Sequence, residues 1–81
     1  MTVTLLAFAR MRELLGFSQR AFTLAEGATI ASLWDAVAAG SPGVRALRAA
    51  TRVARNGELV NDAASVAHGD EIAFLPPVSG G

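Results

Sequence analysis

The chain has 81 residues, with seven basic side chains, all arginine, against seven acidic ones and a formal net charge of zero. That length supports one domain with a modest core, and the charge balance argues against an electrostatic nucleic-acid binder. No apolar run approaches the about 20 residues of a membrane span, and no signal peptide is recognisable at the start, so we expect a cytoplasmic protein. Cysteine is absent and His68 is the single histidine, which leaves no thiolate or histidine cluster for a metal.

The first half of the chain predicts two strands and one helix. The apolar run 3–9 (VTLLAFA) predicts a strand, and residues 11–15 predict a helical turn. The loosely alternating segment 18–24 predicts a second strand that pairs with the first. Thr29 fits a helix N-cap, because its hydroxyl can accept a hydrogen bond from a free amide of the first turn. The apolar face of the helix that follows consists of Ile30, Leu33, Trp34 and Val37.

Short elements fill the second half. Residues 44–50 predict another short helix, and 52–55 and 58–60 predict strands joined by Asn56-Gly57, which tolerates the positive φ of a tight hairpin. The last strand spans 71–75, where the following prolines end it because proline cannot donate to a β ladder. This order predicts an α+β fold of the β-grasp type, a mixed sheet with one main helix packed on one face.

The two faces of the predicted sheet differ in what covers them. Alternation places Thr4, Leu6 and Phe8 on one side of the first strand. Thr4, together with Glu71 in the last strand, marks the side that a single helix leaves uncovered, so Leu6, Phe8 and Leu75 are expected on an open face. An exposed apolar cluster of this kind indicates a partner surface. The alternative is that the second short helix covers it.

The carboxyl terminus carries the chemistry. Pro76-Pro77 favours extended geometry that projects the chain away from the sheet, and 77–81 reaches about 16 Å. Gly80 and Gly81 have no side chains, so they fit a channel too narrow for other residues. The Gly81 carboxylate is ionised at neutral pH and needs activation before it can donate an acyl group. We therefore expect a domain at 1–76 and a flexible tail at 77–81.

A set of short motifs spreads over nearly the whole chain: Phe8-Ala9, Arg12-Glu13, Gly16, Val53-Ala54 and Asn56-Gly57. The longest motif lies within residues 69–81 and consists of Gly69-Asp70-Glu71 and Ala73-Phe74-Leu75-Pro76-Pro77-Val78-Ser79-Gly80-Gly81. Together they resemble the small subunits of molybdopterin synthase, which are ubiquitin-like sulfur carriers. The chain departs from that family at Arg55, where an aliphatic residue is more common.

The resemblance implies a mechanism and partners. An E1-like adenylating enzyme would activate the Gly81 carboxylate with ATP and magnesium, and a sulfur donor protein would convert it to a thiocarboxylate. The large subunit of molybdopterin synthase, in a heterotetramer, would then use this sulfur to convert cyclic pyranopterin monophosphate to molybdopterin. The chain itself would be a non-catalytic carrier subunit that binds no cofactor, metal, nucleic acid or membrane.

The resemblance also implies a contact surface for the large subunit. It includes Phe8, Leu59 and Leu75, and strand parity independently supports Phe8 and Leu75. The tail residues expected in contact with partners are Pro76, Pro77, Val78 and Ser79, whereas Gly80 is assigned with Gly81 to the reacting end of the tail.

Other polar residues are interpreted as structural. His68 fits a solvated turn, and Arg10 and Arg12 fit a solvated loop or a contact with a partner. Three aspartates are interpreted as scattered caps and turn residues, without the paired spacing of acid–base catalysis: Asp35, Asp62 and Asp70.

Three alternatives remain open. A sulfur carrier of thiamine biosynthesis shares the fold and the terminal Gly-Gly, although the Pro-Pro-Val-Ser spacer and the Phe-Ala-Arg segment favour the molybdenum branch. A ubiquitin-like modifier would form amide bonds to target lysines. A pure interaction module would end in an inert, frayed tail.

Overall fold

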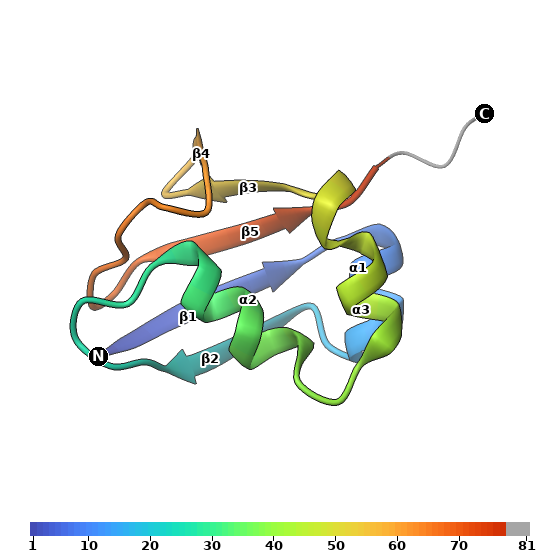
Figure 1. Cartoon of the computed structure of the whole chain (residues 1–81), viewed down its shortest axis with the longest axis horizontal. Helices are drawn as coiled ribbons and strands as arrows, with labels where there is room; N and C mark the ends of the chain where they lie inside the picture. Colours follow the sequence, from blue (N-terminus) through green and yellow to red (C-terminus); the bar gives the residue numbers. More distant parts are fainter. Residues whose placement is uncertain (78–81) are drawn as a thin grey trace.

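The computed structural model describes residues 1–77, which form a five-stranded sheet with helices packed against it (Figure 1). Val78, Ser79, Gly80 and Gly81 lie outside the described residues. In chain order the elements are β1 (Thr2–Ala7), α1 (Ala9–Leu15), β2 (Gln19–Thr23), α2 (Ile30–Ala38), α3 (Pro42–Leu47), the 3₁₀ turn η1 (Arg48–Ala50), β3 (Arg52–Arg55), β4 (Glu58–Val60) and β5 (Glu71–Leu75).

The sheet is mixed, with strand order β2-β1-β5-β3-β4. β1 and β5 run parallel at its centre, whereas β1–β2, β3–β5 and β3–β4 are antiparallel. The expected α+β architecture of the β-grasp type is therefore confirmed. No helix among residues 1–77 has the length and hydropathy of a bilayer-spanning segment.

The main helix α2 begins and packs as its sequence predicts. The Thr29 hydroxyl accepts a hydrogen bond from the Ser32 amide at 3.4 Å, and the Ser32 hydroxyl accepts one from the Thr29 amide at 3.1 Å. This reciprocal cap satisfies two amides that the first turn leaves free. The predicted apolar face is buried throughout: Ile30, Leu33, Trp34 and Val37.

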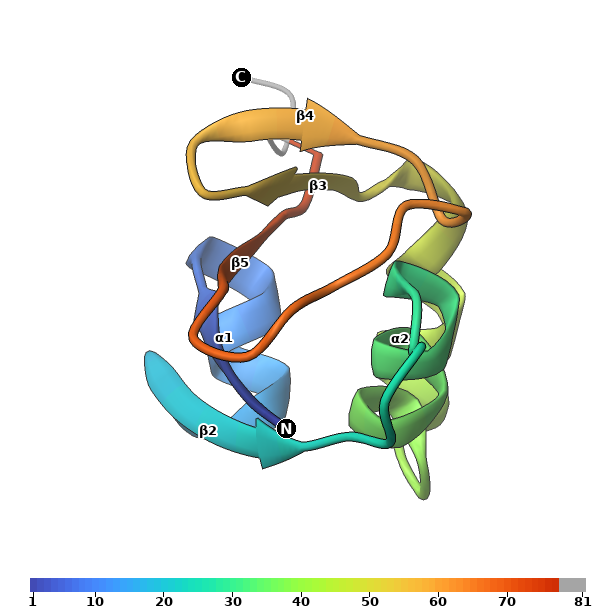
Figure 2. The ribbon, with the colours of Figure 1, turned by 90° about the vertical axis from the view of Figure 1, so that its left-hand side faces the viewer.

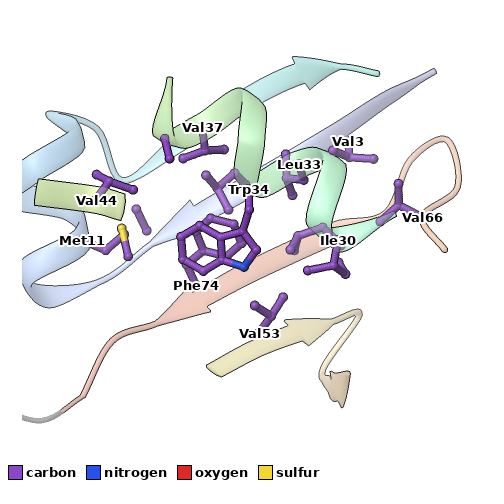
Figure 3. Close-up of a cluster of buried hydrophobic side chains, with 14 of the residues drawn as sticks. Val3, Met11, Ile30, Leu33, Trp34, Val37, Val44, Val53, Val66 and Phe74 are labelled. Carbon is purple, nitrogen blue, oxygen red and sulfur yellow. The ribbon is translucent and has the colours of Figure 1, made fainter. Parts of the chain in front are cut away.

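The core centres on an aromatic stack between α2 and β5. The rings of Trp34 and Phe74 are stacked, with centroids 3.8 Å apart and planes inclined by 15° (Figure 3). Val44 of α3 and Met11 of α1 are fully buried in the same cluster. All three helices therefore contribute to one core.

The end of β1 differs from the prediction. The expected strand 3–9 stops at Ala7, because Phe8 is the N-cap of α1 and its carbonyl accepts hydrogen bonds from the amides of Met11 and Arg12. Helix α1 is thus longer than the expected single turn, and the solvated loop expected around Arg12 is wrong: both Arg10 and Arg12 lie on this helix.

The other boundaries agree closely with expectation. The second short helix begins at Pro42, a residue suited to a first turn because it lacks the amide hydrogen that would be unpaired there, and its last residues form η1. Asn56 and Gly57 have φ of 49° and 87°, as a two-residue hairpin turn requires. The strand bounds 52–55, 58–60 and 71–75 are confirmed.

Candidate partner-binding face and carboxyl-terminal exit

One face of the sheet is open. The main helix α2 lies against the opposite face (Figure 2), and Val44 of α3 is buried in the core rather than over the open face. The alternative that the second short helix covers the exposed apolar cluster is therefore excluded. Phe8 and Leu59 are exposed by 45% and 59%, whereas Leu6 and Leu75 are half-buried.

Strand register assembles an apolar row across this open face. Leu6 of β1 pairs with Ala73 of β5, Ala73 with Ala54 of β3, and Ala54 with Leu59 of β4. Paired residues point to the same side of a sheet, so the four side chains form one band that ends at exposed Leu59. We call this band the apolar row.

A second row lies at the end of the sheet where β5 finishes. Arg52 of β3 pairs with Leu75, and Ala7 of β1 pairs with Phe74. Because β1 and β5 run parallel, the next residues after Ala7 and Phe74, which are Phe8 and Leu75, also lie side by side. Phe8 retains an extended backbone, with φ of −126° and ψ of 153°, so its side chain points away from buried Ala7.

The structure thus brings the three predicted contact residues, Phe8, Leu59 and Leu75, onto one face. Their role in partner binding stays a prediction. Beyond them, Pro76 is half-buried and Pro77 is exposed. The tail assignments for Val78, Ser79, Gly80 and Gly81 lie outside the described residues.

Strand β5 is held before it reaches this exit, by β1 on one side, by β3 on the other and by the core beneath it. Phe74 is fully buried beneath Trp34, and Ile72 is fully buried in the same core. Truncating a buried phenylalanine to alanine costs about 3–5 kcal/mol in typical cores. The exit at Leu75 therefore starts from a fixed position.

A polar cluster that the sequence analysis missed anchors the other end of β5. Asp70 closes a turn, as interpreted, since its amide donates a hydrogen bond to the Ala67 carbonyl at 3.1 Å, but its side chain is buried, which the sequence did not indicate. Its two carboxylate oxygens accept hydrogen bonds from the Ala67 amide at 2.8 Å and from the Asn56 side chain at 3.0 Å. The Arg55 Nε lies 3.1 Å from the same carboxylate.

This surrounding sets the charge state of Asp70. Burial by itself raises the pKa of the carboxyl group, but the hydrogen bonds from Asn56 and Ala67 and the Arg55 guanidinium outweigh burial. The pKa of Asp70 is therefore below its ordinary value, and the group is ionised at neutral pH. The departure from the family pattern at Arg55 thus supplies the counter-charge of a buried carboxylate.

The same cluster joins the β3–β4 turn to the start of β5. The Asn56 side-chain oxygen accepts a hydrogen bond from the Glu71 amide at 2.9 Å, and Arg55 donates to the Ser65 carbonyl at 3.2 Å. We call Arg55, Asn56 and Asp70 the polar anchor. Asn56 was recognisable as a turn residue, but no local pattern indicates its contacts with residues 14 and 15 positions away.

One further interpretation is confirmed and one is corrected. His68 is an exposed turn residue, as expected, and its Nδ1 accepts a hydrogen bond from the Thr2 amide at 3.0 Å, which ties this turn to the start of β1. Asp35 and Asp62 are not scattered, because both bind Arg48, at 3.1 and 2.9 Å. Within residues 1–77 no three acidic or histidine side chains are placed to hold a metal ion.

Known proteins resemble this chain in sequence. A model of the ThiS family matches residues 5–81. The molybdopterin synthase sulfur carrier subunit of Arabidopsis thaliana is 35% identical over 79 residues, which cover 98% of this chain and 82% of the relative. The protein of the same name from Chlamydomonas reinhardtii is 34% identical, with both chains fully covered.

Solved structures share the fold. SAMP1 from Haloferax volcanii has a TM-score of 0.86 and 29% identity, with full coverage of both chains. A putative molybdopterin converting factor, subunit 1, from Pyrococcus furiosus has a TM-score of 0.85 and 26% identity, covering 96% of this chain and 99% of that one. A complex of subunits 1 and 2 of molybdopterin-converting factor from Helicobacter pylori, with a TM-score of 0.70, 23% identity and full coverage of both chains, shows the shared fold alone.

Proposed function

The chain belongs to the ThiS family, and we propose that it is the sulfur carrier subunit of a molybdopterin synthase, with sulfur carried as a thiocarboxylate on Gly81. The relatives at 34–35% identity that bear this name match almost the whole chain. One structural observation carries the proposal: the central strand β5 ends beside Phe8 on an open apolar face. A partner that binds this face is therefore positioned to receive Gly80 and Gly81.

The chemistry proceeds at the main-chain carboxylate. The Gly81 carboxylate attacks the α-phosphorus of ATP on an E1-like activating enzyme that uses magnesium, and pyrophosphate leaves. Sulfur at the sulfide level, delivered by a donor protein, then attacks the acyl carbon and AMP leaves, which forms the thiocarboxylate. The chain has no cysteine, so the terminus is the group available to bear this sulfur.

The large subunit is the partner proposed for the open face. Phe8 and Leu75 lie at the exit and Leu59 ends the apolar row, so one docked surface buries all three. Aromatic side chains are enriched at interface cores, and a few central residues carry most of the binding energy, so Phe8 is the expected anchor. The pterin pocket and the acid–base groups then belong to the large subunit, and this chain supplies the sulfur.

Intact-mass spectrometry tests the proposal. After incubation with the activating enzyme, ATP and a sulfur donor, we expect the mass change of one oxygen replaced by one sulfur, located in the carboxyl-terminal peptide. A control chain with one alanine added after Gly81 should not be loaded, because its terminus carries a Cβ into the activating channel. Sulfur found on a side chain would exclude the proposal.

A second assay separates carrier from enzyme. The loaded chain mixed with the large subunit should convert cyclic pyranopterin monophosphate to molybdopterin. The loaded chain alone should not, because the pterin pocket is assigned to the large subunit. Turnover by this chain in the absence of a second protein would contradict the carrier assignment.

A protein modifier is the second candidate, favoured by the likeness to small archaeal modifier protein 1 of Haloferax volcanii, which has a TM-score of 0.84 and 27% identity. A modifier transfers the Gly81 acyl group to a lysine amine instead of carrying sulfur. Immunoblotting of cells that express a tagged chain distinguishes the two functions. Adducts that resist reduction and depend on Gly81 support a modifier, whereas a carrier leaves a single band.

A further inference from the structure

An arginine-rich groove lies at the beginning of β3 and the end of β4. It has a volume of about 810 Å³, and its lining includes Arg45 of α3, Arg48 of η1, Arg52 of β3, and Leu59, Val60 and Asp62. We call it the arginine groove. Nothing in the proposed sulfur chemistry uses it, and the segment 44–50 that supplies two of its arginines was not singled out by any motif.

The arginines of the groove differ in what they bind. Arg48 is held in place by Asp35 and Asp62, and its guanidinium lies 5.7 Å from the centre of the Trp34 ring. Arg45 and Arg52 are exposed and form no ion pair within residues 1–77. The groove therefore has two available guanidinium groups.

The local charge is positive although the chain is neutral overall. Three arginines line the groove with one carboxylate, that of Asp62, and Arg48 already engages it. Guanidinium groups present a rigid fork of donors that matches a carboxylate and binds it with two parallel hydrogen bonds. The chemistry of the groove is thus complementary to an acidic peptide.

The groove is continuous with the candidate partner-binding face. Leu59 both lines the groove and ends the apolar row, and Arg52 pairs with Leu75 in the row that contains Phe8. A protein that covers Phe8, Leu59 and Leu75 must therefore pass beside Arg52. The occupant of the groove then belongs to the same partner as the occupant of the face.

We propose that the arginine groove binds an acidic segment of the large subunit, with Arg45 and Arg52 as the direct contacts and Arg48 as the side chain that shapes the floor. This inference rests on the proposed function, because it takes the large subunit as the partner. Charges at the rim of an interface act mainly on the association rate and on specificity. The groove accordingly steers the chain onto the large subunit before the apolar face docks.

Binding kinetics test this role. The double variant Arg45→Gln/Arg52→Gln should associate with the purified large subunit about tenfold more slowly at low ionic strength, and the difference should shrink as salt screens it. Arg20→Gln is the control, since it removes one charge from β2 at the opposite edge of the sheet and should change the rate less than twofold. Single variants at Arg45 and at Arg52 show how much each arginine contributes to the change in the association rate.

The possible outcomes distinguish a failure of the groove proposal from a failure of the proposed function. If the wild-type chain does not bind the large subunit, the proposed function fails and this inference with it. If the wild-type chain binds and the double variant associates equally fast at every salt concentration, the groove proposal alone is overturned. Thermal unfolding confirms that each variant folds, as expected for exposed side chains.

Cross-linking identifies the occupant. A photo-reactive amino acid in place of Ala49, an exposed residue that lines the groove, should attach to a stretch of the large subunit rich in aspartate and glutamate. Attachment to a stretch without acidic residues would refute the proposal. The same probe in place of Thr23, on the far edge strand, should give no product with that stretch.

Discussion

The two ends of β5 are built in opposite ways. At its start, Asp70 is buried and is held by Asn56, Ala67 and Arg55. At its end, Leu75 lies beside exposed Phe8, and Pro77 is exposed. The same strand thus has a closed polar end and an open apolar end.

Because of this difference, the start of β5 contributes to the stability of the domain, whereas its end lies on the face that a partner is proposed to bind. The polar anchor and the Trp34–Phe74 stack fix the position of β5 from its start to Phe74. The side chains around the exit contribute little to the core and remain available to a partner. Changes at the two ends should therefore affect different measurements, which the following predictions test in order of decreasing effect.

Deletion of Gly81 should abolish sulfur loading while leaving the melting temperature unchanged. β5 ends at Leu75, so the last residue lies well beyond the final strand in sequence, and we expect its loss to leave folding unaffected. Mass spectrometry of the loading reaction and a thermal melt measure the two effects. A truncated chain that still acquires sulfur would break the assignment of the exit as the functional end.

The variant Phe8→Asp should weaken the complex with the large subunit by about a hundredfold, a loss typical of a central aromatic anchor. Its fold should persist, because Phe8 is exposed by 45% and lies outside the core cluster. Titration calorimetry and circular dichroism measure affinity and folding. Thr23→Asp, which places the same charge on the open face at the β2 edge, is the matched control. Unfolding of Phe8→Asp would show that the exit also stabilises the domain.

The variant Asp70→Asn should lower the free energy of unfolding by about 2 kcal/mol, because hydrogen bonds to a buried charged group are lost and Arg55 loses its counter-charge. Affinity for the large subunit should stay within twofold, since the change lies at the closed end. Urea denaturation and calorimetry provide the two values. A large loss of affinity at unchanged stability would contradict the assignment of stability to the start of β5 and of partner binding to its end.

The smallest expected effect is on pH dependence. Because the pKa of Asp70 is lower in the folded chain than its ordinary value of 3.8, the ionised carboxylate stabilises the fold fully above that value. This contribution is lost as the pH falls through the folded pKa. Urea unfolding between pH 7 and pH 2 should show that the free energy of unfolding falls more steeply with acid for the wild-type chain than for Asp70→Asn. Parallel curves would mean that another group governs acid unfolding.

Local interactions explain what could be predicted from the sequence alone. The bounds of β3, β4 and β5, the Thr29 cap and the Asn56-Gly57 turn depend on residue spacing, on φ preferences and on neighbours a few positions away. Alternation along β1 and β5 likewise predicted the open face. These patterns sufficed for the fold class and for the face on which Leu75 lies.

Tertiary structure alone decided the rest, because it depends on residues distant in the chain. The sequence around Asp70 indicates only an ordinary turn residue, and it is the folded chain that places Asn56 and Arg55 against its carboxylate. Asp35 and Asp62 are unrelated in spacing, yet they meet at Arg48. The arginine groove likewise exists where α3, η1 and the β3–β4 hairpin converge, and no spacing within any one of these segments specifies that meeting.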